Sequence, residues 1–122
     1  MKRYVFLGLT LLLIFLAQTS HAARFTGAYL LQVCEKNEKR EEIINGGHAV
    51  CQSYIAGIID MHNAMRSLSD DLPSADFCVP PDVSLNHLHG IVLEYLRHNS
   101  QHDQYIASLA VVTALYEIYP CD

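Results

Sequence analysis

Basic residues are scarce in this chain, which has 8 Lys and Arg against 13 Asp and Glu in 122 residues. When Lys2 and Arg3 are set aside with the N-terminal segment described below, 6 basic residues remain and the formal charge becomes −7. An acidic surface repels nucleic acid and anionic lipid. We therefore predict no nucleic-acid partner, and a surface suited to a basic or neutral protein.

The chain also lacks the motifs that concentrate chemistry. It has no glycine-rich phosphate loop, no nucleophile elbow and no strip of basic and aromatic residues. Adjacent carboxylates such as Asp70 and Asp71 lie in polar stretches, which is typical of solvated surface rather than of an acid/base pair. These absences predict a binding protein and not an enzyme, with no catalytic residue and no cofactor.

Histidine spacing does not favour a metal site. The candidates are His48, His62, His87, His89, His98 and His102. His87 and His89 are two residues apart, so on one helix they face different directions. His98 and His102 have a suitable spacing, but a helix boundary is expected between them. A zinc site built from these histidines stays an alternative, while we predict that no metal is bound.

A short apolar run near the N-terminus predicts an export signal. Lys2 and Arg3 precede an uncharged run from Val5 to Ala17, and Ser20-His21-Ala22 places small residues where a signal peptidase cleaves. The run of about 13 residues is shorter than the ~20 that span a bilayer as a helix. We predict a signal peptide of residues 1–22, cleaved after Ala22, with a periplasmic product and no membrane attachment. An uncleaved anchor is the alternative.

Four cysteines, at positions 34, 51, 78 and 121, follow the predicted signal. An even count in an exported segment of about 100 residues is typical of a single small domain with two disulfides, and it leaves no thiol free for catalysis. Residues 23–122 are therefore predicted to form one domain.

Apolar periodicity predicts an all-α domain of four helices, because no stretch alternates with period two for long enough to form a sheet. The first helix is expected to start near Phe25 and to end near residues 34–37. The second is expected to start near Glu41 or after Gly46-Gly47. Its apolar stripe comprises Cys51, Ile55, Ile58, Ile59, His62 and Met65. Gly57 within it predicts close approach of a neighbouring helix, and a break follows over residues 67–81.

The last two helices have readable starts. Ser84 is a plausible N-cap, with Val83 and Leu88 spaced as a hydrophobic staple. Ser100 with Asp103 resembles a capping box, so the fourth helix is predicted to begin there and to end before Pro120. Because this helix is apolar or small nearly all round, it is expected to lie at the centre of the domain.

Four cysteines allow three pairings, and the sequence alone does not choose between them. Short connections favour antiparallel neighbouring helices. In an up-down-up-down arrangement, the end of the first helix lies near the start of the second, and the loop before the third lies near the end of the fourth. Our hypothesis is therefore Cys34–Cys51 at one end of the bundle and Cys78–Cys121 at the other.

Short motifs occur in a fixed order along the predicted domain. They are Phe25-x-Gly27-x-x-Leu30-x-x-x-Cys34, Cys51-x-x-Tyr54-Ile55-x-Gly57-Ile58-x-Asp60, Phe77-Cys78-x-Pro80, the region from Tyr95-Leu96 to His98, and Ala114-Leu115-x-x-x-Tyr119-Pro120-Cys121. In this order the chain resembles the Rap/Tai family of type VI secretion immunity proteins. Members of that family tend to have a proline after the histidine, where this chain has Asn99, another helix-breaking residue.

The resemblance implies a small, exported, mostly helical protein. Members bind a peptidoglycan-cleaving amidase effector in the periplasm and block its active site, so it implies an amidase effector as the partner. The motif residues are structural and do not mark the contact surface. A periplasmic stress or chaperone-like helical protein without an effector is the alternative, and a metal-binding enzyme fragment is a third possibility. A homodimer through exposed apolar residues of the second helix is also possible.

Loops are the expected contact elements, because a loop can enter an active-site cleft. The first candidate is the loop from Ser69 to Asp76, with Asp70, Asp71 and Asp76. The second is the turn from His98 to Asp103, with His98, His102 and Asp103. Ordinary solvated connections are the alternative for both.

Overall fold

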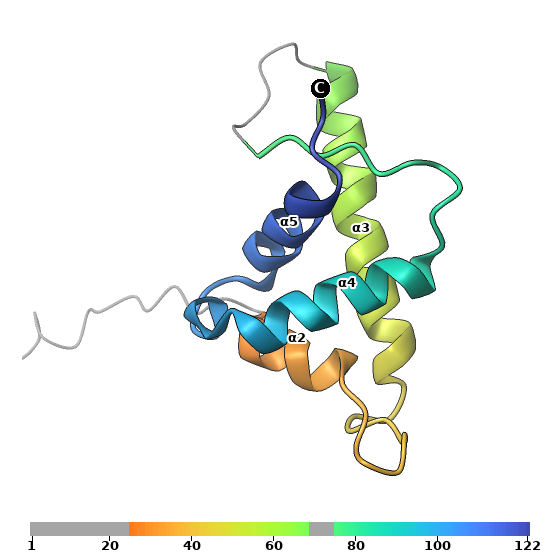
Figure 1. Ribbon diagram of the computed structural model, residues 1–122, viewed down its shortest axis with the longest axis vertical. Helices are drawn as coiled ribbons and strands as arrows, with labels where there is room; N and C mark the ends of the chain where they lie inside the picture. Colours follow the sequence, from red (N-terminus) through yellow and green to blue (C-terminus); the bar gives the residue numbers. More distant parts are fainter. Residues whose placement is uncertain (1–24, 69–74) are drawn as a thin grey trace, which may run out of the picture.

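Four α-helices and one short 3₁₀ helix make up the described part of the protein, residues 25–68 and 75–122 of a computed structural model (Figure 1). The helices are α2 (Gly27–Cys34), α3 (Gly47–Leu68), α4 (Leu85–His98) and α5 (Ala107–Ile118), with the 3₁₀ helix η1 (Ser100–His102) before α5. The predicted all-α class is confirmed. Residues 1–24, which include the predicted signal peptide and its cleavage site, and residues 69–74, which include Asp70 and Asp71, lie outside the described residues.

The start of α2 is held by both a cap and a glycine. The hydroxyl of Thr26 accepts a hydrogen bond from the amide of Tyr29 at 3.2 Å, which satisfies one of the free N–H groups of the first turn. A Cβ atom on Gly27 would collide with the backbone carbonyl of His102, so only glycine allows η1 to approach this closely. The close approach predicted for Gly57 is wrong, since that glycine is exposed and faces open space.

Helix α3 begins at Gly47, the later of its two predicted starts. The Glu42 carboxylate accepts hydrogen bonds from the amides of Gly46, at 2.8 Å, and His48, at 3.0 Å. Gly46 has a φ of 77°, which glycine adopts readily. The helix runs to Leu68, slightly past the predicted end. Its predicted stripe is buried at Cys51, Ile55 and His62 and partly buried at Ile58 and Ile59, but Met65 is exposed and was wrongly included.

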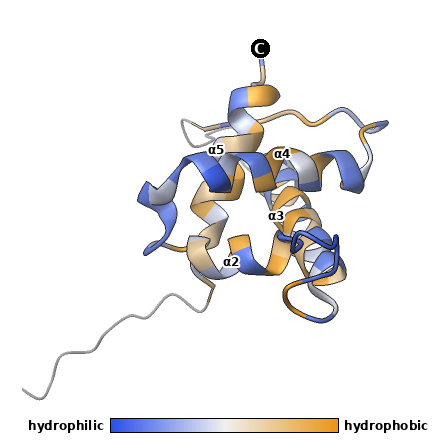
Figure 2. Cartoon of the chain, turned by 60° about the horizontal axis from the view of Figure 1, so that its bottom comes forward, coloured by the Kyte–Doolittle hydropathy of each residue, from blue (hydrophilic) through white to orange (hydrophobic). Residues whose placement is uncertain are grey.

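Helix α4 begins as predicted. The Ser84 hydroxyl accepts a hydrogen bond from the amide of His87 at 3.2 Å. Leu88, Val92 and Leu96 recur on one side of the helix and are buried. The opposite side is more polar, and Figure 2 shows hydrophilic and hydrophobic bands along α4 beside the more evenly hydrophobic α5. Helix α4 therefore has one side in the core and one side free for solvent or a partner.

The predicted start of the fourth helix at Ser100 is wrong, because that serine opens η1 and α5 begins at Ala107. The intervening backbone bonds to the start of α2. Gly27 donates to the Tyr105 carbonyl at 3.0 Å, and the Ala107 amide donates to the Phe25 carbonyl at 2.8 Å. Backbone groups committed to another segment cannot close a continuous helical turn, so tertiary contacts override the capping signal.

Helix α5 contacts all three other helices but is not enclosed on every side. Its inward residues are buried and mostly small: Ala107, Ala110, Val111, Ala114 and Leu115. Three others are 40–54% exposed: Leu109, Tyr116 and Ile118. The helix therefore does not lie at the centre as predicted. Small side chains let it pack closely on one face while the other stays open.

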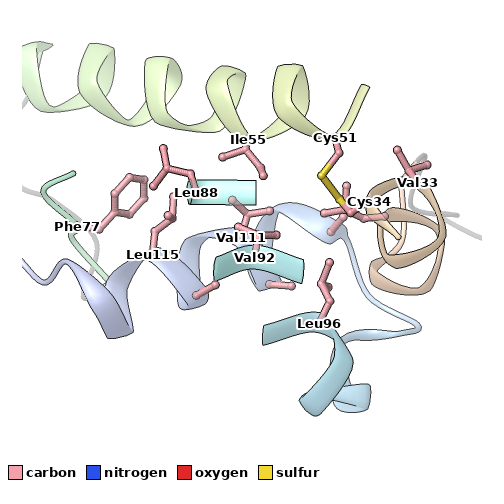
Figure 3. Packing of buried hydrophobic residues seen from close by; sticks show 14 residues of the cluster. Val33, Cys34, Cys51, Ile55, Phe77, Leu88, Val92, Leu96, Val111 and Leu115 are labelled. Atoms are coloured by element: carbon pink, nitrogen blue, oxygen red, sulfur yellow. A yellow bond between two sulfur atoms is a disulfide. The ribbon is translucent and has the colours of Figure 1, made fainter. Parts of the chain in front are cut away.

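The hydrophobic core lies among the four helices, and Figure 3 shows the Cys34–Cys51 disulfide at one end of it. A second disulfide ties the other end. Cys34–Cys51 joins the end of α2 to the start of α3, and Cys78–Cys121 joins the segment before α4 to the C-terminus. These are the two pairs favoured by the sequence argument. In the described ranges, no helix is both long enough and apolar enough to cross a membrane.

Candidate functional site: a groove between α4 and α5

An open groove of about 740 Å³ lies between α4 and the C-terminal half of α5. It is lined by Ser84, Asn86, His87, Gly90, Ile91, Glu94, Tyr95, His98, Asn99, Ala114, Glu117 and Ile118. The α4 residues recur every three or four positions and so form one side of that helix. Two small residues, Gly90 and Ala114, leave room between the helices, and a Cβ atom added at Gly90 would meet nothing within 4 Å.

Two glutamates give the groove an acidic character. Glu94 has a 64% exposed side chain, with one carboxylate oxygen 3.4 Å from His98 Nδ1 and the other 3.7 Å from Arg97 Nη1. Arg97 also pairs with Glu35. Glu117 is exposed, carries no ion pair in the described structure, and lies near Tyr95. A free carboxylate at the rim of a groove suits a cationic group of a partner.

Tyr95 is the polar anchor at the inner side of the groove. Its hydroxyl lies 3.0 Å from His102 Nε2, and the Asn99 amide donates to its backbone carbonyl at 2.8 Å. Burial and the negative charge of Glu117 raise the pKa of Tyr95, so it stays protonated at neutral pH. The one hydroxyl at the groove's α4 end, Ser84, serves as a helix cap. This set of side chains suits recognition of a partner rather than nucleophilic catalysis.

The residues predicted from the second candidate loop are divided by the structure. His98 is exposed and lies in the groove, with Nδ1 2.9 Å from the Glu94 carbonyl. His102 is buried against Tyr95. Asp103 is half-buried, and its backbone carbonyl accepts from the Ala28 amide at 3.2 Å. Only His98 is therefore placed where a partner can reach it directly.

Asp76, from the first candidate loop, belongs to a local network at the other end of the domain. Its Oδ1 lies 2.9 Å from His62 Nε2 and 3.7 Å from Arg66 Nε. The ring of His62 stacks on the buried Phe77, with centroids 3.9 Å apart, and the Arg66 guanidinium contacts both sulfurs of the Cys78–Cys121 disulfide. These contacts give Asp76 a structural role.

Sequence reasoning missed Glu94, Tyr95 and Glu117 as groove residues. Glu94 and Tyr95 lie on the side of α4 away from the buried Leu88, Val92 and Leu96, so helical spacing carried a signal for these two. Glu117 carried no such signal. It reaches the groove through the packing of α5 against α4, which the sequence does not specify.

Beside the first disulfide lies a second group of side chains that could hold a metal. One ring nitrogen of His89 and the sulfurs of Cys34 and Cys51 lie within 4.8 Å of one another, and all three residues are buried. His89 Nε2 is 2.8 Å from the Cys34 carbonyl oxygen. Burial lowers the pKa of His89, so the ring is neutral at pH 7. In the described chain both cysteines are used in the disulfide.

Comparison with known proteins gives one family. Residues 26–121 match the sequence model of the Rap1a immunity proteins. No curated protein and no solved structure is significantly similar to this chain. The match spans the whole described helical domain, including both disulfides and the groove, and it confirms the resemblance seen in the ordered motifs. The chain belongs to the Rap1a immunity protein family.

Proposed function

We propose that this protein is a periplasmic immunity protein that binds a peptidoglycan amidase effector of a type VI secretion system and blocks its active site. The family match over residues 26–121 carries the proposal. The predicted signal peptide of residues 1–22 supports it, because cleavage after Ala22 would release the domain of residues 23–122 into the compartment that contains peptidoglycan. The acidic charge of that domain suits a cationic partner.

We place the main contact surface in the groove between α4 and α5. It combines concave shape with the exposed carboxylates of Glu94 and Glu117 and the exposed ring of His98. A basic segment at the rim of the effector's active site would find two acceptors there, and binding at the rim would cover the cleft. Asp70 and Asp71 stay a predicted second contact.

Charge reversal tests this surface. Glu94→Lys/Glu117→Lys is expected to weaken binding of the cognate amidase by more than about tenfold, since like charges at an interface lower both the association rate and the affinity. The matched control is Glu38→Lys, on an exposed residue that does not line the groove. Affinity is measured by calorimetry, and protection by survival of cells that export the amidase to the periplasm. Equal affinity of the groove variant and the control would remove the groove from consideration.

The same design separates the groove from the loop. Asp70→Lys/Asp71→Lys is tested beside the groove variant under the same conditions. Loss of binding in the loop variant alone would make the predicted loop the contact element and would keep the immunity function. Full binding by both variants would exclude both surfaces.

Exposed apolar residues near the end of α3 favour the alternative of a chaperone-like binding protein or a homodimer. Met61, Met65 and Leu68 are 63%, 49% and 86% exposed and recur at helical spacing on one side of the helix. The genetic neighbourhood discriminates these functions, because an adjacent gene for a Cys/His hydrolase indicates immunity. Light scattering of Met61→Lys against the unmodified protein tests the homodimer.

A further inference from the structure

The first disulfide sits where three helices bring metal-binding side chains together. Cys34 ends α2, Cys51 lies in the second turn of α3, and His89 comes from α4. His48 lies three residues before Cys51, which places both on one side of α3. The rings of His48 and His89 stack with their centroids 4.8 Å apart. Three buried side chains of zinc-ligand type, Cys34, Cys51 and His89, therefore lie together, and the partly buried His48 lies beside them.

Five buried histidine nitrogens in the described residues have no hydrogen-bond partner, and two of them, on His89 and His48, lie beside this disulfide. A backbone carbonyl can only accept, so His89 Nε2 carries the proton and donates to the Cys34 carbonyl. The lone pair then lies on Nδ1, which is buried without a hydrogen-bond partner in a residue only 6% exposed. His48 Nδ1 is buried and unpartnered as well. Unpaired buried polar atoms are uncommon in native structures and call for an explanation.

The hydrogen bond of His89 matches the one that metal-ligating histidines make through their second ring nitrogen. A metal-ligating histidine commonly donates its other N–H to a backbone carbonyl, which fixes the tautomer and orients the ring. His89 shows this bond already. A tetrahedral ion with Zn–S bonds of about 2.3 Å holds its two sulfurs roughly 3.8 Å apart, a separation that rotation of the two cysteine side chains can supply.

We propose that in the dithiol form of the protein Cys34, Cys51, His89 and His48 bind one thiolate-preferring metal ion of the zinc(II) class. A dithiol reductant converts the protein disulfide into two thiols and is itself oxidised to a cyclic disulfide. Binding of the ion then displaces one proton from each thiol, and the two thiolates and two neutral imidazoles complete the coordination.

A metal ion bound at this point would cross-link the same two segments as the disulfide. Both join the end of α2 to the start of α3, so the ion would hold the fold in chains that have not been oxidised. It would also protect the thiols, because a thiolate that is bound to the ion is not free to form the disulfide. This role is independent of the effector and of the α4–α5 groove.

Cobalt(II) provides the test, because its thiolate complexes absorb visibly. The protein carries Cys78→Ser/Cys121→Ser, so that its only thiols are those of Cys34 and Cys51. After reduction and refolding without oxygen, we expect one cobalt per chain, a thiolate-to-cobalt band with tetrahedral d–d bands, displacement by zinc, and a higher melting temperature with zinc. The oxidised protein is expected to show none of these.

Histidine variants assign the ligands. His89→Gln is expected to weaken cobalt binding by at least about tenfold and to change the d–d bands, and His48→Gln to weaken it less. The control is His87→Gln, an exposed position on the same helix. Absence of a thiolate band, or equal cobalt affinity of the His89 and His87 variants, would overturn the proposal. If the reduced chain is unfolded, failure of zinc to restore its helical circular dichroism would overturn it as well.

Discussion

The two disulfides of this domain hold its two ends in different ways. Cys34 and Cys51 are both buried in the hydrophobic core, with exposures of 2% and 0% (Figure 3). Cys78 is exposed and Cys121 half-exposed, and Arg66 contacts both of their sulfurs. The first bridge is therefore part of the core, whereas the second ties two chain segments at the surface. Both bridges restrict the unfolded chain, and the first also contributes packing in the core.

Loop length alone predicts that the Cys78–Cys121 bridge stabilises the fold more than the buried Cys34–Cys51 bridge. Cys34–Cys51 closes 17 residues and Cys78–Cys121 closes 43. In the chain-entropy model these loops contribute about 3 and about 4 kcal/mol. Burial reverses the order, because replacing two core sulfurs also leaves a cavity. We therefore expect the position of a bridge in the core to outweigh the length of its loop.

Removal of each bridge provides the largest expected effect. Cys34→Ala/Cys51→Ala is expected to lower the free energy of unfolding by ~5 kcal/mol, from loop entropy together with the core cavity. Cys78→Ala/Cys121→Ala is expected to lower it by ~3–4 kcal/mol. Urea unfolding followed by circular dichroism measures both. A larger loss for the second variant would show that loop entropy dominates and would break the comparison.

Phe77, next to the exposed Cys78–Cys121 bridge, is expected to contribute strongly to the free energy of unfolding. Phe77 is 1% exposed and stacks on His62, although it belongs to a segment without helix. Phe77→Ala is expected to cost about 4 kcal/mol, because the core loses a ring and gains a cavity. The control is Val79→Ala, two residues on and only partly buried. Equal unfolding free energies for the two variants would contradict this assignment.

Reduction rates should separate the bridges directly. At limiting dithiol, the Cys78–Cys121 bridge is expected to be reduced first, because attack requires access to a sulfur. Arg66→Gln should slow this step severalfold, since the guanidinium stabilises the departing thiolate. Alkylation and mass spectrometry identify the reduced cysteines. The control is Arg97→Gln, which removes a cation that pairs with Glu35 and does not contact the Cys78–Cys121 sulfurs. Reduction of Cys34–Cys51 first would refute the comparison.

The smallest expected effect concerns Glu42, whose carboxylate caps the start of α3 near the buried bridge. Hydrogen bonds from the His48 and Gly46 amides lower the pKa of Glu42 below its usual 4.5. The unfolded chain therefore binds this proton more readily, and the cap contributes stability above pH 4.5 that is lost as the pH falls through the folded pKa. Glu42→Gln should unfold earlier in urea at pH 7, and its difference from the unmodified protein should shrink below pH 4.5. A difference in unfolding free energy that does not change with pH would show that the charge of the Glu42 carboxylate does not stabilise the fold.

Local signals predicted the parts of the fold that depend on local chemistry. Ser84 caps α4 as expected, because a serine followed by a helical apolar stripe meets its partner within three residues. The capping signal at Ser100 failed, because backbone groups of residues 103–107 bond to the start of α2 instead. Gly57 was expected to contact a neighbour, but Gly27 makes the close contact, with a carbonyl 75 residues away in sequence.

The candidate site was predicted only in part for the same reason. His98 was predicted as a contact residue and lies in the groove. Asp76 and His102 were predicted too, but they contact His62 and Tyr95 within the domain. Helical spacing carries the signal that Glu94 and Tyr95 share one side of α4. The α5 side of the groove, which includes Glu117, depends on how α5 packs against α4.

The sequence by itself determined the helical class, the start of α4, the family and the choice of cysteines as bridge residues, because each depends on short-range patterns or on ordered motifs. Only the tertiary structure decided which bridge is buried, where α5 begins, and which polar residues share a groove. Those properties depend on contacts between residues far apart in the chain, where each backbone group and each side chain has several possible partners and packing selects one.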